Sequence, residues 1–203
     1  MPAIRAAAAA ALTADGAIVI DLRPADEFAA GHPDGAVNLA YGSKVGYWAG
    51  WVLPPDVPLL LLGGDAAQGR DVAAQLLRVG LDRLAGSIDG GFDAWRAAAL
   101  PSAAIRQIRV QDLRRDGERI QVVDVRTARE WRAGHVPGSV NIPVGEIAAR
   151  RGELPHGQTI ATICEGGYRS SLAASLLAQE GVPSLVNVAG GMAAYRADAE
   201  PAR

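Results

Sequence analysis

The feature that most constrains the fold of this 203-residue chain is an internal repeat. Two pairs of segments match: Asp21–Arg23 with Asp124–Arg126, 103 positions apart, and Gly90–Trp95 with Gly190–Tyr195, 100 positions apart. A period of this length is the size of a common single domain and is too long for a solenoid of short repeats. The sequence therefore predicts two copies of one domain, residues 1–100 and 105–203.

Within each copy, short apolar runs alternate with helical patterns, which is typical of the α/β class. The runs Leu59–Leu62 and Thr159–Ile163 are typical of buried strands. Thr127–Glu130 has the spacing of a capping box and predicts a short helix, and a further helix is expected near Val144–Arg151. We expect each copy to be a parallel sheet covered by helices on both faces, with binding crevices at the carboxyl ends of the strands.

Composition excludes several classes of protein. Hydrophobic residues make up 49% of the chain and charged residues 21%, with a net charge of −2, which argues against disorder and against a nucleic-acid surface. No apolar run approaches the roughly 18 residues of a membrane span, and Ala6–Leu12 is interpreted as an alanine-rich helix. A single cysteine cannot form an internal disulfide, which favours a reducing, cytoplasmic location.

That cysteine, Cys164, begins the loop Cys164–Ser170, between the predicted strand Thr159–Ile163 and a helical pattern starting at Ser171. A helix N-terminus gathers backbone N–H groups and the positive end of the helix dipole, so it suits an anion or a thiolate. Free cysteine is also often a buried hydrophobe. We favour a reactive Cys164, because Gly166 and Gly167 free the backbone and Arg169 stabilises negative charge.

The other side chains of the loop have more open roles. Arg169 could favour the Cys164 thiolate and pair with an anionic donor or with Glu165. Glu165 could repel anionic donors or be a solvated loop residue. Tyr168 is a candidate for the pocket wall, and Ser170 or Ser171 is expected to cap the helix.

Histidines and aromatic residues are given structural roles. His32 and His135 occupy matching positions although only one copy has a cysteine, so we expect a shared structural hydrogen bond and no metal site.

The Asp21–Arg23 and Asp124–Arg126 segments are expected to form ion pairs that order loops. Tyr41, Tyr47, Trp48 and Trp51 are candidates for a domain interface or a partner surface.

The first copy lacks a nucleophile. Cys164 corresponds to Gly63 or to Gly64, depending on the side from which the copies are aligned, and the two offsets predict that the loop of the first copy is one residue longer. We interpret this loop as a degenerate site whose scaffold persists.

Motifs of the second copy occur in an order that resembles the successive signatures of the rhodanese family, the sulfurtransferases: Asp124–Arg126, Gly134–Gly138, Cys164–Ser170 and Val188–Tyr195. The resemblance implies two tandem rhodanese-like domains, the first inactive. It implies that Cys164 takes a sulfane sulfur from thiosulfate or a persulfide, becomes a persulfide, and passes the sulfur to a thiol or to cyanide without a cofactor. The loop residues Glu165, Gly166, Gly167, Tyr168, Arg169 and Ser170 would then bind the substrate. The pair also looks like the rhodanese modules of persulfide dioxygenases, which implies a persulfide-producing or sulfide-oxidising partner protein.

Two rival functions remain open. A non-catalytic module could carry or sense oxidised sulfur at Cys164, and steady-state turnover would separate it from an enzyme. A cysteine phosphatase is the weaker rival, because related phosphatases place five residues between cysteine and arginine, whereas four separate Cys164 from Arg169.

Overall fold

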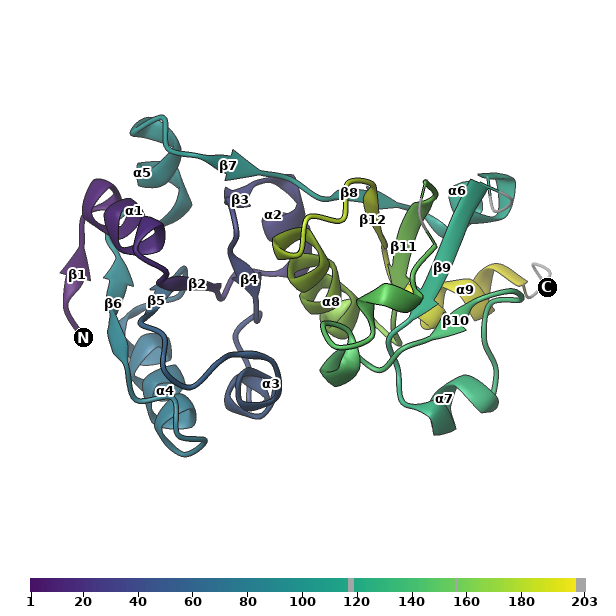
Figure 1. The fold of residues 1–203 in the computed structure, drawn as a ribbon, viewed down its shortest axis with the longest axis horizontal. Helices are drawn as coiled ribbons and strands as arrows, with labels where there is room; N and C mark the ends of the chain where they lie inside the picture. Colours follow the sequence, from purple (N-terminus) through teal and green to yellow (C-terminus); the bar gives the residue numbers. More distant parts are fainter. Residues whose placement is uncertain (117–118, 156, 200–203) are drawn as a thin grey trace. The chain divides into compact units, whose positions relative to one another are not determined.

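The structure is a computed structural model that describes residues 1–116, 119–155 and 157–199. It divides into two compact units, Met1–Ala104 and Ile105–Arg203, called unit 1 and unit 2 (Figure 1). Each unit is described by itself.

Unit 1 contains a five-stranded parallel sheet in the order β1-β6-β5-β2-β4. Its strands are β1 (Ala3–Ile4), β2 (Ile18–Asp21), β4 (Val37–Asn38), β5 (Leu59–Leu62) and β6 (Leu84–Ile88). Its helices are α1 (Ala6–Ala14), α2 (Ala25–Ala30), α3 (Val45–Val52), α4 (Ala66–Leu77) and α5 (Gly91–Ala97). A separate antiparallel pair joins β3 (His32–Pro33) to β7 (Ser102–Ala103).

Unit 2 contains a second five-stranded parallel sheet, in the order β10-β9-β11-β12-β8. Its strands are β8 (Arg106–Ile108), β9 (Ile120–Asp124), β10 (Val140–Asn141), β11 (Thr159–Ile163) and β12 (Leu185–Val188). Its helices are α6 (Val110–Asp116), α7 (Ala128–Arg132), α8 (Tyr168–Gln179) and α9 (Gly191–Ala199).

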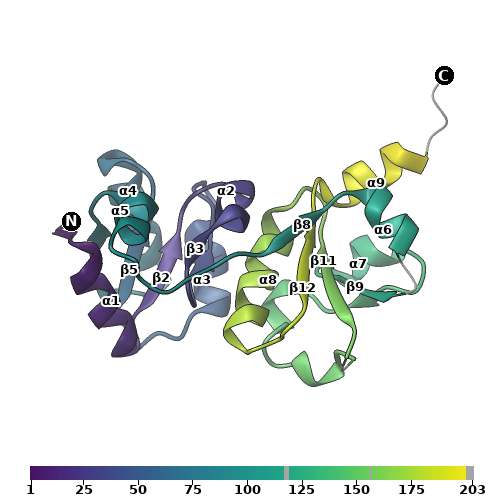
Figure 2. The same ribbon diagram turned by 90° about the horizontal axis from the view of Figure 1, so that it is seen from above.

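The two sheets have the same topology when the strands are matched in chain order, which confirms the predicted duplication and the α/β class. In each sheet the chain first crosses in one direction and then returns. Right-handed crossovers therefore place α1 and α2 on one face of the unit 1 sheet and α3 and α4 on the other. Accordingly, α3 contacts α4, while α5, which follows the last strand, contacts α1. Figure 2 shows α8 on one side of the unit 2 sheet and α6 and α9 on the other.

The central strands are buried on both faces, as their apolar sequences predict. Leu59–Leu62 is fully buried, and the predicted strand Thr159–Ile163 is β11, whose last four residues are buried. Alternate residues of β11 face opposite helices: Ala161 and Ile163 join a core with Leu113 and Met192 from α6 and α9. On the other face, Thr162 donates a hydrogen bond to the Ser170 carbonyl of α8.

The prediction of a helix near Val144–Arg151 is wrong. The segment forms two short 3₁₀ turns, η2 (Val144–Glu146) and η3 (Arg151–Glu153). Their backbone bonds are of the i to i+3 kind, from Glu146 to the Pro143 carbonyl and from Glu153 to the Arg150 carbonyl. By contrast, Thr127 and Glu130 form the predicted capping box at α7.

Candidate active site

Cys164 lies at the carboxyl end of β11, the central strand of the unit 2 sheet. The strand ends at Ile163, which is in register with Asp124 at the end of β9. Three residues, Cys164–Gly166, connect the strand to Gly167, the N-cap of α8. The cysteine therefore occupies the sheet edge at which open α/β folds place their binding crevices.

The Cys164 side chain is buried but is held by a polar contact. The residue is 1% exposed, as a buried hydrophobe would be. However, the Gly167 N–H donates a hydrogen bond to its Sγ across 3.1 Å. Gly167 has a φ of +106°, in the region that favours glycine, so its conformation directs this N–H toward sulfur. The 12-residue helix α8 adds the positive end of its dipole at the same point.

The first turn of α9 anchors the cysteine loop from the other side. The Met192 N–H donates to the Cys164 carbonyl across 2.7 Å, and the Ala193 N–H donates to the Glu165 carbonyl across 3.1 Å. A trans peptide unit holds its C=O and N–H on opposite sides. Because the two carbonyls face α9, the N–H groups of Glu165 and Gly166 point away from that helix.

Arg169 pairs with Glu130 rather than with Glu165. Two of its N–H groups donate to the two carboxylate oxygens of Glu130, each across 2.8 Å. This pairing, with help from Thr127, lowers the pKa of Glu130 to about 2. It also raises the pKa of the Arg169 guanidinium, mainly through the hydrogen bonds to Glu130. Of the two partners considered for Arg169, an anionic donor and Glu165, the loop carboxylate is not the one it pairs with, because α7 supplies Glu130 instead.

Glu165 is engaged by two other arginines. Its carboxylate pairs with Arg196 of α9 and lies 3.4 Å from an N–H group of Arg126. Hydrogen bonding to Arg196 is the main cause that lowers the pKa of Glu165. These cations offset the negative charge by which Glu165 could repel anionic donors.

The predicted ion pairs at the strand ends are confirmed. Arg126 is 3% exposed in its side chain and donates to the buried Asp124 carboxylate across 2.7 Å and to the Gly134 carbonyl. In unit 1, Arg23 pairs with Asp21 and donates to the Gly31 carbonyl in the same way.

Tyr168 and Ser170 differ in what they contact. The Tyr168 hydroxyl is buried and has no hydrogen-bond partner in the described part of the chain, and burial raises the pKa of this phenol. Ser170 is buried and its Oγ donates to the Gly167 carbonyl. The prediction that Ser170 or Ser171 caps α8 is wrong, because the helix starts earlier, with Gly167 as its N-cap.

The residues around the loop that sequence reasoning missed are Glu130, Arg126, Arg196 and the start of α9. Glu130 was recognised only as part of a capping box, and Arg126 only as a partner of Asp124. The matching glycine pairs at the starts of α5 and α9 were a usable signal. Gly191 lies so close to the loop that an added Cβ would stand 2.4 Å from the Cys164 carbonyl oxygen.

Both predicted histidine roles are confirmed. His32 Nδ1 lies 2.7 Å from the Phe28 carbonyl and its ring stacks on Phe28, while His135 makes the same two contacts with Trp131. Within residues 1–116, 119–155 and 157–199, no three His, Cys, Asp or Glu side chains form a group that could hold a metal ion.

The equivalent loop in unit 1 has a different shape. Leu62 is in register with Asp21, as Ile163 is with Asp124, so Gly63 is the structural equivalent of Cys164. Only Gly63 and Gly64 separate β5 from Asp65, the N-cap of α4. The unit 1 loop is therefore one residue shorter than that of unit 2, and the predicted extra residue is wrong.

None of the helices in the described ranges combines the length and apolar character that a bilayer crossing requires.

Comparison with known proteins identifies the domain. The family model of the rhodanese-like domain matches residues 5–98 and again residues 109–198. Thiosulfate sulfurtransferase GlpE of Pseudomonas putida is 39% identical over 83 residues, which are 41% of this chain and 73% of that protein. The "Putative sulfur carrier protein YrkF" of Bacillus subtilis is 33% identical over 103 residues, 51% of this chain and 55% of YrkF. The chain thus spans about half the length of that relative.

A rhodanese-related protein from Thermoplasma volcanium provides a solved structure with 32% identity and a TM-score of 0.45, covering 47% of this chain and 95% of that one. Because the family model matches nearly the whole of each unit, the chain belongs to the rhodanese-like domain family and carries the domain twice.

Proposed function

We propose that unit 2 is a sulfurtransferase that carries a sulfane sulfur on Cys164. The thiolate attacks the outer sulfur of thiosulfate or of a persulfide. A new S–S bond forms at Cys164, and the donor's S–S bond breaks as sulfite or a thiolate leaves with the electron pair. An acceptor thiolate or cyanide then attacks the outer sulfur, and Cys164 leaves as a thiolate.

The Gly167 N–H aimed at the Cys164 Sγ is the observation that carries this proposal. A hydrogen-bond donor and a helix N-terminus at sulfur stabilise the anionic form that both steps require. Arg169 adds a positive charge, which its bond to Glu130 holds in place. The named activity of the GlpE relative supports the same reaction class.

The burial of Cys164 limits how a sulfur donor can reach its Sγ. With 1% of the residue exposed, Cys164 presents very little surface to a donor. Gly166 is exposed and has no heavy atom within 4 Å of a Cβ built on it, so the structure leaves open space beside the loop at that residue.

A sulfur carrier without efficient turnover is the second candidate. The same burial favours slow exchange of a bound sulfur, and the name of YrkF describes such a protein. Unit 1, which has Gly63 in place of the cysteine, would then act as a scaffold or a docking module. For both candidates we propose small sulfur donors and thiol acceptors, a persulfide-producing or sulfide-oxidising protein as a partner, and a cytoplasmic setting.

Intact-mass spectrometry tests the proposal. After incubation with thiosulfate or glutathione persulfide, the protein is expected to gain the mass of one sulfur, and Cys164→Ser is expected to gain none. An unchanged mass with every donor would overturn both candidates. If the mass increases, steady-state transfer to cyanide or a thiol separates the enzyme, which turns over many times, from the carrier, which stops after one.

The phosphatase reading is tested in parallel with a chromogenic aryl phosphate. We expect negligible hydrolysis, since only four residues separate Cys164 from Arg169 and that arginine is bound to Glu130. Hydrolysis that is lost in Cys164→Ser would favour phosphoryl chemistry instead.

A further inference from the structure

A row of polar side chains crosses the unit 2 sheet beneath the cysteine loop. Thr162 of β11 is in register with Asn187 of β12, which is in register with Gln107 of β8. In-register residues of neighbouring parallel strands point to the same face of a sheet, so the three side chains form one row. Thr162 and Asn187 are buried. The Thr162 hydroxyl lies 3.4 Å from Asn187 Oδ1, and Asn187 Nδ2 donates to Gln107 Oε1 across 3.3 Å. We call these three residues the polar row.

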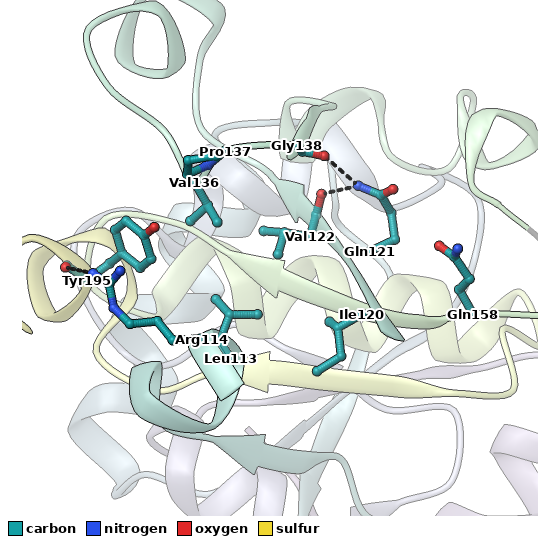
Figure 3. A pocket seen from close by; sticks show the side chains of 10 residues that line it. All are labelled: Leu113, Arg114, Ile120, Gln121, Val122, Val136, Pro137, Gly138, Gln158 and Tyr195. Carbon is teal, nitrogen blue, oxygen red and sulfur yellow. Dashed lines mark hydrogen bonds between the residues drawn. The ribbon is translucent and has the colours of Figure 1, made fainter. Parts of the chain in front are cut away.

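The polar row lies on the face of the sheet that α8 covers. Ala161 and Ile163, on either side of Thr162, belong to the apolar core on the other face. Figure 3 shows that other face, where Val122, in register with Ala161, lines a cavity of about 460 Å³. Thr162 therefore points toward α8, on the same side of the strand as Cys164 two positions later.

Hydrogen bonds connect the polar row to the sulfur. Thr162 Oγ1 donates to the Ser170 carbonyl, in the first turn of α8, across 3.0 Å. Ser170 Oγ donates to the Gly167 carbonyl across 3.1 Å, and the Gly167 N–H donates to Cys164 Sγ across 3.1 Å. Because Thr162 and Cys164 lie two positions apart in the chain, these three hydrogen bonds link the start of α8 to the end of β11 at two points. Together they set the distance from the Gly167 N–H to the sulfur.

Unit 1, which lacks the cysteine, also lacks the polar row. Leu61 takes the place of Thr162, since each is the second-last residue of its central strand in the same register. Leu61 is fully buried, and the other members of its row are Ser87 and Ala3. An apolar group can replace a buried hydrogen-bonded one at little cost to stability when the shapes match. The fold by itself therefore does not require the polar row.

The two units also hold the start of the following helix in different ways. In unit 1 the Asp65 carboxylate caps α4 by accepting from the N–H groups of Ala67 and Gln68. Gly167, the N-cap of α8, has no side chain for this purpose, and a carboxylate there would compete with an anionic sulfur for N–H groups. The first turn of α8 is instead held from the core side, through the carbonyls of Ser170 and Gly167. This arrangement fixes the helix without using its N-terminal N–H groups.

We propose that Thr162 is a positioning residue for the chemistry at Cys164, an inference that rests on the proposed sulfur transfer. Its hydroxyl fixes the first turn of α8, so that the Gly167 N–H stays on Sγ and stabilises the thiolate. The rest of the polar row surrounds this hydroxyl with polar groups. A side chain without the hydroxyl would leave the Ser170 carbonyl facing an apolar group and would let the start of α8 shift away from the sulfur.

Titration of Cys164 tests the proposal without a sulfur donor. The ultraviolet absorbance of the thiolate is followed against pH in the full-length chain, and each protein is compared with its own Cys164→Ser form as the blank. Thr162→Val has nearly the same shape without the hydroxyl. It is expected to move the titration midpoint to higher pH by about half a pH unit, as for part of one hydrogen bond to sulfur. Thr162→Ser, which keeps the hydroxyl, should retain the midpoint of the parent.

Ser175→Ala is the matched control. It removes another buried hydroxyl of α8, one that donates to the Leu172 carbonyl beyond the first turn. We expect this variant to lower stability in urea unfolding without shifting the titration midpoint. Thr162→Ala removes the same hydroxyl as Thr162→Val without a branched side chain and should give the same shift. The test therefore does not depend on the folding of one variant.

The rate of sulfur loading connects the titration to function. Below the midpoint, a shift of about half a pH unit lowers the thiolate fraction about threefold. The more basic thiolate is the better nucleophile, so loading of Thr162→Val from thiosulfate should slow by about twofold. Absence of loading in the parent would overturn the proposed function, whereas the titration would still decide the role of Thr162.

Three results would overturn the positioning role. The first is an unchanged midpoint in the folded variants that lack the hydroxyl. The second is an equal shift in Ser175→Ala, which would indicate a general loosening of α8. The third is a shift in Thr162→Ser as large as that in Thr162→Val, which would assign the effect to the methyl group.

Discussion

Arg169 of α8 and Glu130 of α7 form a two-pronged ion pair, with both hydrogen bonds at 2.8 Å. The pair joins the helix that follows the cysteine loop to the helix that follows the neighbouring strand β9. Because Glu130 also caps α7 with Thr127, one carboxylate orders both helix starts at the sheet edge. The position of Arg169 beside Cys164 therefore depends on a residue 39 positions away in the sequence.

Glu130→Gln should lower stability in a way that depends on pH. The pKa of this carboxyl is lowered from 4.5 to about 2, so its stabilising effect is fully present above pH 4.5 and is lost as the pH falls toward 2. Urea unfolding midpoints of the parent and the variant should differ most above pH 5 and converge at low pH. Glu27→Gln, an exposed carboxylate of unit 1, is the control. A difference that stays constant with pH would contradict the prediction.

Gly191→Ala should damage the cysteine loop more than Gly91→Ala damages unit 1. Both glycines have nearly the same φ, +58° and +57°, so the backbone cost of alanine is matched. A Cβ at residue 191 would stand 2.4 Å from the Cys164 carbonyl oxygen, whereas one at residue 91 meets nothing within 4 Å. We expect Gly191→Ala to cost about 1–3 kcal/mol more in unfolding free energy and to slow sulfur loading. Equal unfolding midpoints for the two variants would show that the cysteine loop shifts to accommodate the added Cβ without a loss of stability.

Gly167→Ala should weaken the contact to sulfur through backbone strain alone. The residue has a φ of +106° and no heavy atom within 4 Å of an added Cβ, so the expected cost of about 1 kcal/mol or more comes from the conformation. The rate of thiosulfate loading, followed by mass spectrometry, should fall as the Gly167 N–H moves from Sγ. Gly166→Ala, at an exposed neighbour without a positive φ, should stay within about 0.5 kcal/mol of the parent. Equal loading rates for the two variants would argue against a role for this hydrogen bond.

Arg196→Ala should slow the loading of sulfur from anionic donors. Arg196 is the main partner of the Glu165 carboxylate, so its removal leaves negative charge beside the loop. Loading from thiosulfate is expected to slow severalfold at low salt and to recover as salt screens the charge. Adding Glu165→Gln to Arg196→Ala should restore the rate. A double variant as slow as the single one would show that Arg196 acts in another way.

Moving the cysteine to unit 1 should not create a second site. In a Cys164→Ser background, Gly63→Cys places a thiol at the equivalent strand end, but residue 63 has a φ of +82° and its Cβ would stand 2.8 Å from Arg23 Cγ. The loop is also one residue shorter, with Asp65 as the helix N-cap. We expect no mass increase with any donor. Sulfur uptake by this variant would show that the first unit retains a working scaffold.

Local sequence patterns determined the duplication, the α/β class, the strand that precedes Cys164 and the helix that follows it. Such patterns succeed because they depend only on neighbouring residues: the periodicity of a strand or helix and the spacing of a capping box each span a few positions. Copy-to-copy matching also identified the histidines as structural, since both rings make the same contact with a carbonyl four residues earlier. The same matching misjudged the relative loop lengths, because an offset between copies does not show where a helix begins.

Tertiary structure alone decided which charges meet at the site. The order β10-β9-β11-β12-β8 brings the ends of β9 and β11 together and sets α9 against the loop, so Glu130 reaches Arg169 and Arg196 reaches Glu165. The sequence offers several carboxylates to each long arginine side chain, and only the packing of distant segments selects among them. Tertiary structure also decided that Gly167 is the N-cap of α8, because its positive φ and its contact to the Cys164 sulfur depend on where β11 ends and α8 starts.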